Sequence, residues 1–201
     1  MRLEARSAFG TPLGTAISVS GFASESVALR ERADIGCVLF TAGIDIPHAV
    51  DLGSAAASVT LPVAAGCVST GSRHTAMWLS PRSWLVQCGV AEELELVARL
   101  NAAFVDKGAH AVGFTDALCW FELSGDAAGE LLAEGGFVSL ERGGLPVRHA
   151  KRTIVAQVAA VVTLVDQSVW LVGVERSRGR YFAEWLIAAA RAFQGKPHER
   201  P

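Results

Sequence analysis

The sequence predicts an α+β fold made of two similar halves, in which mainly antiparallel sheets carry helices packed on them. Three observations lead to this fold class: short apolar runs bounded by turn residues, amphipathic stretches at helical spacing, and an order of strand, hairpin and helix that occurs twice. We expect a single compact domain over residues 1–201, with halves at about 28–108 and 109–193. We also expect an irregular N-terminal segment, 1–27, and a polar tail, 194–201.

The first half begins with an apolar strand, Ile35–Phe40, and continues into a helix that has Pro47 in its first turn. Its clearest helix lies in residues 91–108, "AEELELVARLNAAFVDKG", where apolar side chains recur at helical spacing. Acidic residues at the positive end and a terminal Gly108 fit the expected start and stop of that helix.

Between these helices, the stretch "WLSPRSWLV" places Trp78 and Trp84 on either side of a short turn. Pro81 suits the second position of a tight turn because its φ is already fixed, so the stretch predicts a hairpin. The stretch is either a reactive loop or a scaffold. A reactive loop needs a nucleophile beside a base, and the stretch holds no histidine or carboxylate. We therefore interpret the tryptophans as packing anchors.

The second half repeats this order. "HAVGFTD" and "ALCWFEL" predict another pair of strands, followed by a short helix capped by Ser124 or Asp126 and ended by the glycines at 135–136. Residues 153–174 predict two or three more strands with a turn at 166–168. The closing helix ends at Gly195, and its apolar stripe consists of Tyr181, Phe182, Trp185, Leu186, Ala189 and Phe193.

Composition restricts the possible functions. The net charge of −2 gives no basic footprint for nucleic acid, and every apolar run is too short to span a bilayer. The N-terminus lacks the apolar run of a signal peptide, so we expect a cytoplasmic protein. Four dispersed cysteines without a C-x-x-C pattern suggest reduced core thiols. The mean hydropathy of +0.34 is apolar for a soluble chain and hints at obligate assembly.

Motifs for chemistry are missing from the sequence. It contains no dinucleotide or phosphate-binding glycine loop, no H-E-x-x-H and no G-x-S-x-G, and its five histidines show no ligand spacing. The densest basic cluster, Arg148, Lys151 and Arg152 around His149, could receive a carboxylate or phosphate or form an interface rim. A second basic run, at residues 176–180, precedes the last helix and is either exposed or contacts an acidic partner.

Four motifs carry a family resemblance: "WLSPRSWLV", "ALCWFELSGDAAGELLAEG", "AKRTIVAQVAAVV" and "ERSRGRYFAEWL". In this order they resemble the gamma subunit of heterotetrameric sarcosine oxidase, over roughly residues 28–190. At the hairpin the usual pattern is similar to W-L-G-P-D-E-W-L, and this chain has Ser80, Arg82 and Ser83 where that pattern has Gly, Asp and Glu. The helix motif lacks its usual proline before Asp126.

The resemblance implies a folate-binding, aminomethyltransferase-like fold without a cofactor of its own. Alpha and beta subunits would hold FAD, FMN, NAD and tetrahydrofolate, and a delta subunit would hold zinc. The complex would oxidise sarcosine or a related N-methyl amino acid. We expect no catalytic, cofactor-binding or metal-binding residue in this chain. The residues that we expect to be structural or to lie at an interface are Trp78, Pro81, Arg82, Trp84, Trp120, His149, Arg152, Tyr181 and Trp185.

Two other classes remain open. One is a stand-alone folate-binding or aminomethyltransferase-like one-carbon protein, although the K-G-C-Y-x-G-Q-E stretch typical of such relatives is absent, and "ERGGLPVRHAKRT" occupies the corresponding region. The other is an accessory domain for RNA modification, which the mild negative charge disfavours.

Overall fold

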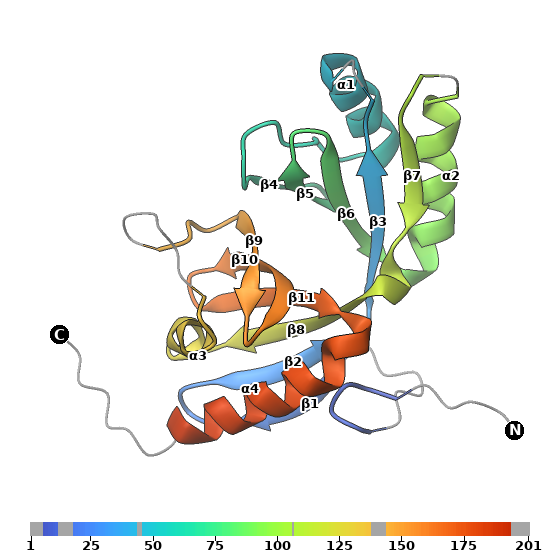
Figure 1. The fold of residues 1–201 in the computed structure, drawn as a ribbon. Coiled ribbons are helices and arrows are strands. Elements are labelled where there is room, and N and C mark those ends of the chain that lie inside the picture. Colours follow the sequence, from blue (N-terminus) through green and yellow to red (C-terminus); the bar gives the residue numbers. More distant parts are fainter. Residues whose placement is uncertain (1–5, 12–17, 44–45, 106, 138–143, 194–201) are drawn as a thin grey trace, which may run out of the picture. The chain divides into compact units, whose positions relative to one another are not determined.

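The computed structural model describes residues 6–11, 18–43, 46–105, 107–137 and 144–193, and in this part of the chain it confirms an α+β fold with two antiparallel sheets and four α-helices (Figure 1). The strands are β1 (Ser18–Ala23), β2 (Ala28–Arg32), β3 (Ile35–Thr41), β4 (Val68–Thr70), β5 (Thr75–Ser80), β6 (Ser83–Gly89), β7 (His110–Gly113), β8 (Leu118–Ser124), β9 (His149–Val155), β10 (Val158–Asp166) and β11 (Val169–Glu175). The helices are α1 (Ile46–Ala57), α2 (Glu93–Ala103), α3 (Ala128–Glu134) and α4 (Gly179–Phe193).

Contacts within the chain define two compact units. The single domain expected from the sequence stays a prediction. The five-stranded unit comprises residues 34–117 and 148–151. The six-stranded unit comprises residues 1–33, 118–147 and 152–201. Each unit has its own sheet and its own pair of helices, which is why each can bury a separate core.

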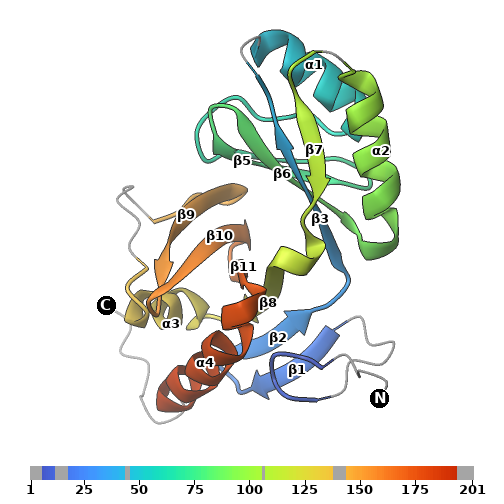
Figure 2. The same ribbon diagram turned by 45° about the vertical axis from the view of Figure 1, so that its right-hand side comes forward.

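The five-stranded unit has the strand order β4-β5-β6-β3-β7. Alternate residues of β3 and β6, such as Val38, Phe40 and Trp84, point to one face of the sheet, where they pack with Leu96 and Leu100 of α2. Alanines of α1 join the same core, so both helices cover one face (Figure 2). Small side chains let α1 approach the sheet closely; a Cβ on Gly53 would lie 3.1 Å from the ring of Phe40, on β3.

The six-stranded unit has the strand order β1-β2-β8-β11-β10-β9. Its core joins Phe121 of β8 to Phe182 of α4, with ring centroids 5.5 Å apart. Leu131 and Leu132 of α3 are fully buried in the same core, so α3 and α4 also share one face of their sheet. The short N-terminal segment contributes Phe9, whose ring packs edge-on against Phe121 at 5.7 Å.

The two halves expected near residues 28 and 109 begin at β2 and β7, and from there the order of elements is the same: two strands, a helix, three strands and a helix. The sheet orders also correspond, because β4-β5-β6-β3-β7 matches β9-β10-β11-β8-β2 position by position. The first strand of each repeat belongs to the sheet of the other repeat: β2 pairs with β8, and β7 pairs with β3. Sequence halves and compact units therefore differ by one exchanged strand each and by residues 148–151, which belong to the five-stranded unit.

Three details depart from the sequence analysis. Residues 18–23, expected to be irregular, form strand β1 at the edge of the six-stranded sheet. The segments "HAVGFTD" and "ALCWFEL" do form strands, but β7 and β8 lie in different sheets instead of pairing. Gly195 and the tail 194–201 lie outside the described residues.

Candidate functional site

The hairpin of β5 and β6 is built around two opposed tryptophans, Trp78 and Trp84. Trp84 is 1% exposed, its indole N–H donates to the carbonyl of Pro62 at 2.7 Å, and its ring stacks on Phe40 with centroids 5.7 Å apart. Pro81 and Arg82 are exposed at the turn, where the backbone carbonyl of Arg82 accepts a hydrogen bond from Ala42 at 2.9 Å. The hairpin is thus anchored by packing and backbone bonds.

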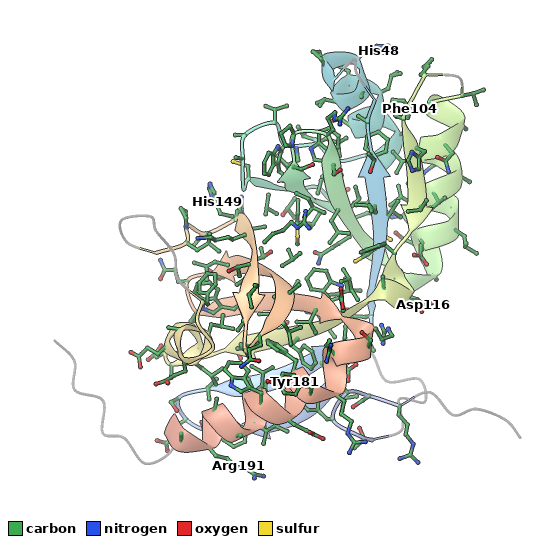
Figure 3. The ribbon with its side chains drawn as sticks, viewed as in Figure 1. His48, Phe104, Asp116, His149, Tyr181 and Arg191 are labelled. Atoms are coloured by element: carbon green, nitrogen blue, oxygen red, sulfur yellow. The ribbon has the colours of Figure 1, made fainter. Side chains whose placement is uncertain are left out.

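The strand β4 connects this hairpin to the basic cluster. Trp78 N–H donates to the carbonyl of Cys67, and Val68 N–H donates to the carbonyl of Arg148. Cys67 also forms an isolated antiparallel bridge with His149, and the Cys67 Sγ and His149 Nε2 atoms lie 3.7 Å apart. His149 begins β9 (Figure 3). The structure therefore brings His149 to the hairpin through Cys67, which no sequence motif indicated because the two residues are 82 positions apart.

The members of the basic cluster around His149 differ in exposure. Arg148 and Arg152 are exposed, whereas His149 and Lys151 are half-buried. Arg148 lines an open depression of about 610 Å³ on the five-stranded unit. The rest of its lining comes from the end of α1 and from β4: Ser54, Ser58, Val59, Thr60, Val68, Ser69, Thr70 and Gly71.

The remaining expected aromatic residues belong to the six-stranded unit. Trp120 is 2% exposed on β8 and its ring covers Gly173, while Trp185 is half-buried with its ring 5.5 Å from Phe182. Tyr181 is 48% exposed at the start of α4 (Figure 3). The indole N–H of Trp120 has no hydrogen-bond partner among the described residues. Tyr181 is the exposed aromatic side chain of this group, while the two tryptophans pack within their unit.

A buried histidine ties α1 to the chain before α2. His74 is 3% exposed; its Nδ1 lies 2.6 Å from the carbonyl oxygen of Ala57, and its Nε2 lies 3.1 Å from Glu92 Oε2. The other oxygen of Glu92 accepts from Arg73 at 2.5 Å. Hydrogen bonds from Arg73 and then from His74 lower the pKa of the Glu92 carboxyl below its ordinary value. Because Arg73, His74 and Glu92 are hydrogen-bonded to one another, we interpret them as a structural link between α1 and the chain before α2.

A buried carboxylate has a similar role in the six-stranded unit. Glu31 is 3% exposed; Oε2 accepts from the backbone N–H of Ala8 at 2.7 Å, and Oε1 accepts from the thiol of Cys119 at 3.2 Å. Burial, and then the charge of Glu31, raise the pKa of the Cys119 thiol well above its ordinary range. Burial likewise raises the pKa of Cys88, on β6, to about 11. Both thiols are protonated at neutral pH.

Two absences hold for the described part of the chain. Within residues 6–11, 18–43, 46–105, 107–137 and 144–193, no three His, Cys, Asp or Glu side chains gather closely enough to bind a metal ion. No helix in the same ranges is long and apolar enough to cross a bilayer.

The fold places the chain in a known structural class. It is similar to the glycine cleavage system aminomethyltransferase T from Bartonella henselae, with a TM-score of 0.61 and 12% identity, covering 80% of this chain and 45% of that one. It is also similar to heterotetrameric sarcosine oxidase from Corynebacterium sp. U-96 in complex with pyrrole 2-carboxylate, with a TM-score of 0.79 and 23% identity, covering 92% of this chain and 95% of that one. Both likenesses support the aminomethyltransferase-like fold expected from the sequence.

Sequence comparison then gives the family. The model of the sarcosine oxidase gamma subunit family matches residues 42–192, and the chain belongs to this family. The match includes the hairpin, the depression and His149. No curated protein sequence is significantly similar to the chain.

Proposed function

We propose that this chain is a non-catalytic, structural gamma subunit of a heterotetrameric flavin-dependent oxidase that demethylates sarcosine or a related N-methyl amino acid. The observation that carries the proposal is the family match over residues 42–192. The structural relative described as heterotetrameric supports the same assembly, because 95% of that relative's chain is covered.

The partners in this proposal are the alpha, beta and delta subunits. The larger two hold FAD, FMN, NAD and tetrahydrofolate, and the delta subunit holds zinc; this chain holds none of them. The complex acts in the cytoplasm. Exposed apolar side chains support a role in assembly: Leu94 on α2 is 81% exposed and Val63, in the loop before β4, is 72% exposed. Apolar side chains left this exposed are suited to burial against another subunit.

A structural role is also supported by what the polar groups do. Glu31, His74 and Glu92 are bonded within their own units, and Trp84 is used for packing. None of these four side chains is a nucleophile beside a free base, which acyl-transfer or covalent chemistry would need. The thiol of Cys67 and the imidazole of His149, 3.7 Å apart, are the pair that the His149→Ala variant below tests. Arg82, His149 and Arg152 remain the polar residues best placed to contact a neighbouring active site.

The experiment is reconstitution of the full chain with its co-expressed partners, after co-purification from the native source has identified those partners by mass. We would compare the parent complex with complexes carrying Arg82→Ala, His149→Ala or Arg152→Ala, and confirm the subunit content of each. We expect every fully assembled complex to turn over an N-methyl amino acid within about threefold of the parent, since loss of a catalytic donor costs roughly 10²–10³-fold in kcat.

Two results would contradict the proposal. A variant that assembles fully yet turns over at least about a hundredfold more slowly would place a residue of this chain in an active site. A chain that captures no partner and binds a tetrahydrofolate analogue by itself would support the stand-alone one-carbon protein instead.

A further inference from the structure

The depression on the five-stranded unit follows β4 from one end to the other. Arg148 lies at one end, because its carbonyl bonds to the N–H of Val68. Ser58 lies at the other end, because a Cβ on Gly71 would be 3.1 Å from the carbonyl oxygen of Ser58. The intervening residues of an extended strand span about 10 Å. The depression is therefore longer than a single inorganic anion.

The polar side chains that line the depression carry hydroxyl groups and one positive charge. The depression offers one guanidinium, from Arg148, and hydroxyl groups from α1, the following loop and β4, and none of the described residues that line it carries a carboxylate. The side chains of Arg148, Ser69 and Thr70 make no hydrogen bond to another described residue, and those of Ser58 and Thr60 make none either. A group of donors with no acceptor among the described residues is suited to an anionic ligand.

The two ends of the depression differ in charge. The Arg148 end is cationic, whereas Ser58 lies just after the C-terminus of α1, where the helix dipole disfavours an anion. Both residues adopt left-handed backbone conformations, with φ of 61° at Arg148 and 53° at Ser58. Side chains other than glycine adopt this region at some cost, and here it places one polar side chain at each end.

From these observations we propose that the depression binds a small organic oxyanion, with its carboxylate or phosphate group against Arg148, Ser69 and Thr70. The opposite end of the ligand carries hydrogen-bond donors, which face the hydroxyl of Ser58 and the carbonyl end of α1. The guanidinium forms a charge-assisted pair with the anion, and the hydroxyls donate to its remaining oxygens. The site does not depend on the proposed assembly, because every residue in it belongs to this chain.

The test is a titration of the isolated full chain, labelled with ¹⁵N, with inorganic phosphate and separately with succinate as the carboxylate probe. Chloride at matched ionic strength is the reference, because it corrects for general screening. We expect saturable amide shifts confined to residues 58–60, 68–71 and 148. The probe that binds more tightly identifies the phosphate or the carboxylate as the preferred group.

Two variants make the test specific. Arg148→Gln should weaken binding by about tenfold or more, because it removes the charged donor. Arg152→Gln, at an exposed arginine of β9 that does not line the depression, should leave binding unchanged. Both variants are at exposed positions, and their melting temperatures would be measured to verify that they fold.

Three outcomes would overturn the inference. The first is the absence of saturable shifts with either probe. The second is equal weakening by Arg148→Gln and Arg152→Gln, which would mean non-specific attraction to a basic surface. The third is a lack of binding by the isolated chain combined with failure of Arg148→Gln to assemble, which would mean that a partner's acidic side chain occupies the depression. Because the titration uses this chain alone, its result is separate from the assay of the complex.

Discussion

Trp84 and Trp170 occupy equivalent places in the two repeats, near the start of β6 and β11, but their surroundings differ. Trp84 pairs across its sheet with Phe40, is fully buried, and donates to Pro62 at 2.7 Å. Trp170 pairs with Leu123 and is half-buried, with Phe137 edge-on at 5.6 Å. In the first repeat, the loop after α1 reaches the indole ring of Trp84, and the Pro62 carbonyl in that loop accepts the indole N–H. Trp84 is therefore an anchor of the core.

The difference arises in the helix that precedes each group of three strands. In the first repeat α1 has 12 residues, and the chain after it buries Val59 and Leu61 before reaching Pro62. In the second repeat α3 has 7 residues, and Gly129 is the helix residue that approaches Trp170; a Cβ on this glycine would lie 3.4 Å from the indole ring. A shorter helix with a glycine at the contact covers less of the indole.

The largest effect that we expect from this comparison is at the two tryptophans. Trp84→Ala should lower the free energy of unfolding by about 3–5 kcal/mol, through lost burial, a cavity and the unpaired Pro62 carbonyl. Trp170→Ala should cost roughly 1–2 kcal/mol, because its side chain is already partly exposed to water. Urea unfolding of both variants measures the difference. Equal losses would show that the two environments are energetically alike.

A smaller effect is expected at Gly173, which faces Trp120 across the β8–β11 pair. A Cβ at this buried glycine would lie 2.7 Å from the Trp120 ring, so Gly173→Ala should destabilise by about 1–3 kcal/mol through overpacking. The corresponding position of the first repeat is Gln87, which faces Cys37 and meets no such ring. Gly89→Ala is the matched control, since Gly89 is exposed and its nearest Cβ contact is 3.7 Å. A Gly173→Ala variant as stable as the control would mean that the Trp120 ring can move aside.

The smallest effect is a pH dependence that belongs to the five-stranded unit. The pKa of Glu92 is lowered by Arg73 and His74 in the folded chain, so its carboxylate stabilises the fold above the ordinary carboxyl value of about 4.3. This contribution is lost as the pH falls from there through the lowered folded pKa. Glu92→Gln should therefore reduce the melting temperature at pH 7 and flatten its dependence on pH below about 4.

The control for this measurement is Glu95→Gln, because Glu95 makes an exposed pair with Arg99 at 3.8 Å on α2. Exposed pairs of this kind contribute little. If the two variants gave the same pH profile, the tie between Glu92 and His74 would have no measurable effect on stability.

The sequence predicted the regular elements well where local patterns determine them. The hairpin turn at Pro81, the turn at 166–168 and the helices that became α2 and α4 all have strong periodicity or turn residues, and the structure confirms them. Strand β1 was missed because "SVSGFA" is rich in serine and glycine and forms a sheet edge, so its formation depends on pairing with β2.

Long-range pairing accounts for what the sequence could not predict about the candidate site. Cys67 meets His149, and Val68 meets Arg148, only because β4 and the start of β9 lie side by side. No local pattern connects segments so far apart. The basic cluster was visible in the sequence, but its members differ in exposure, and Arg148 lines a hydroxyl-lined depression whose other residues carry no motif.

The exchanged first strands have a consequence for the origin of this fold. A single repeat carries a strand that cannot complete its own sheet, since β2 pairs only within the sheet of β8 and β7 only within the sheet of β3. One copy alone would leave that sheet edge open and its leading strand unpaired, and two copies could satisfy each other by swapping strands. The present chain thus has the connectivity of a strand-swapped dimer whose two protomers are joined in one polypeptide.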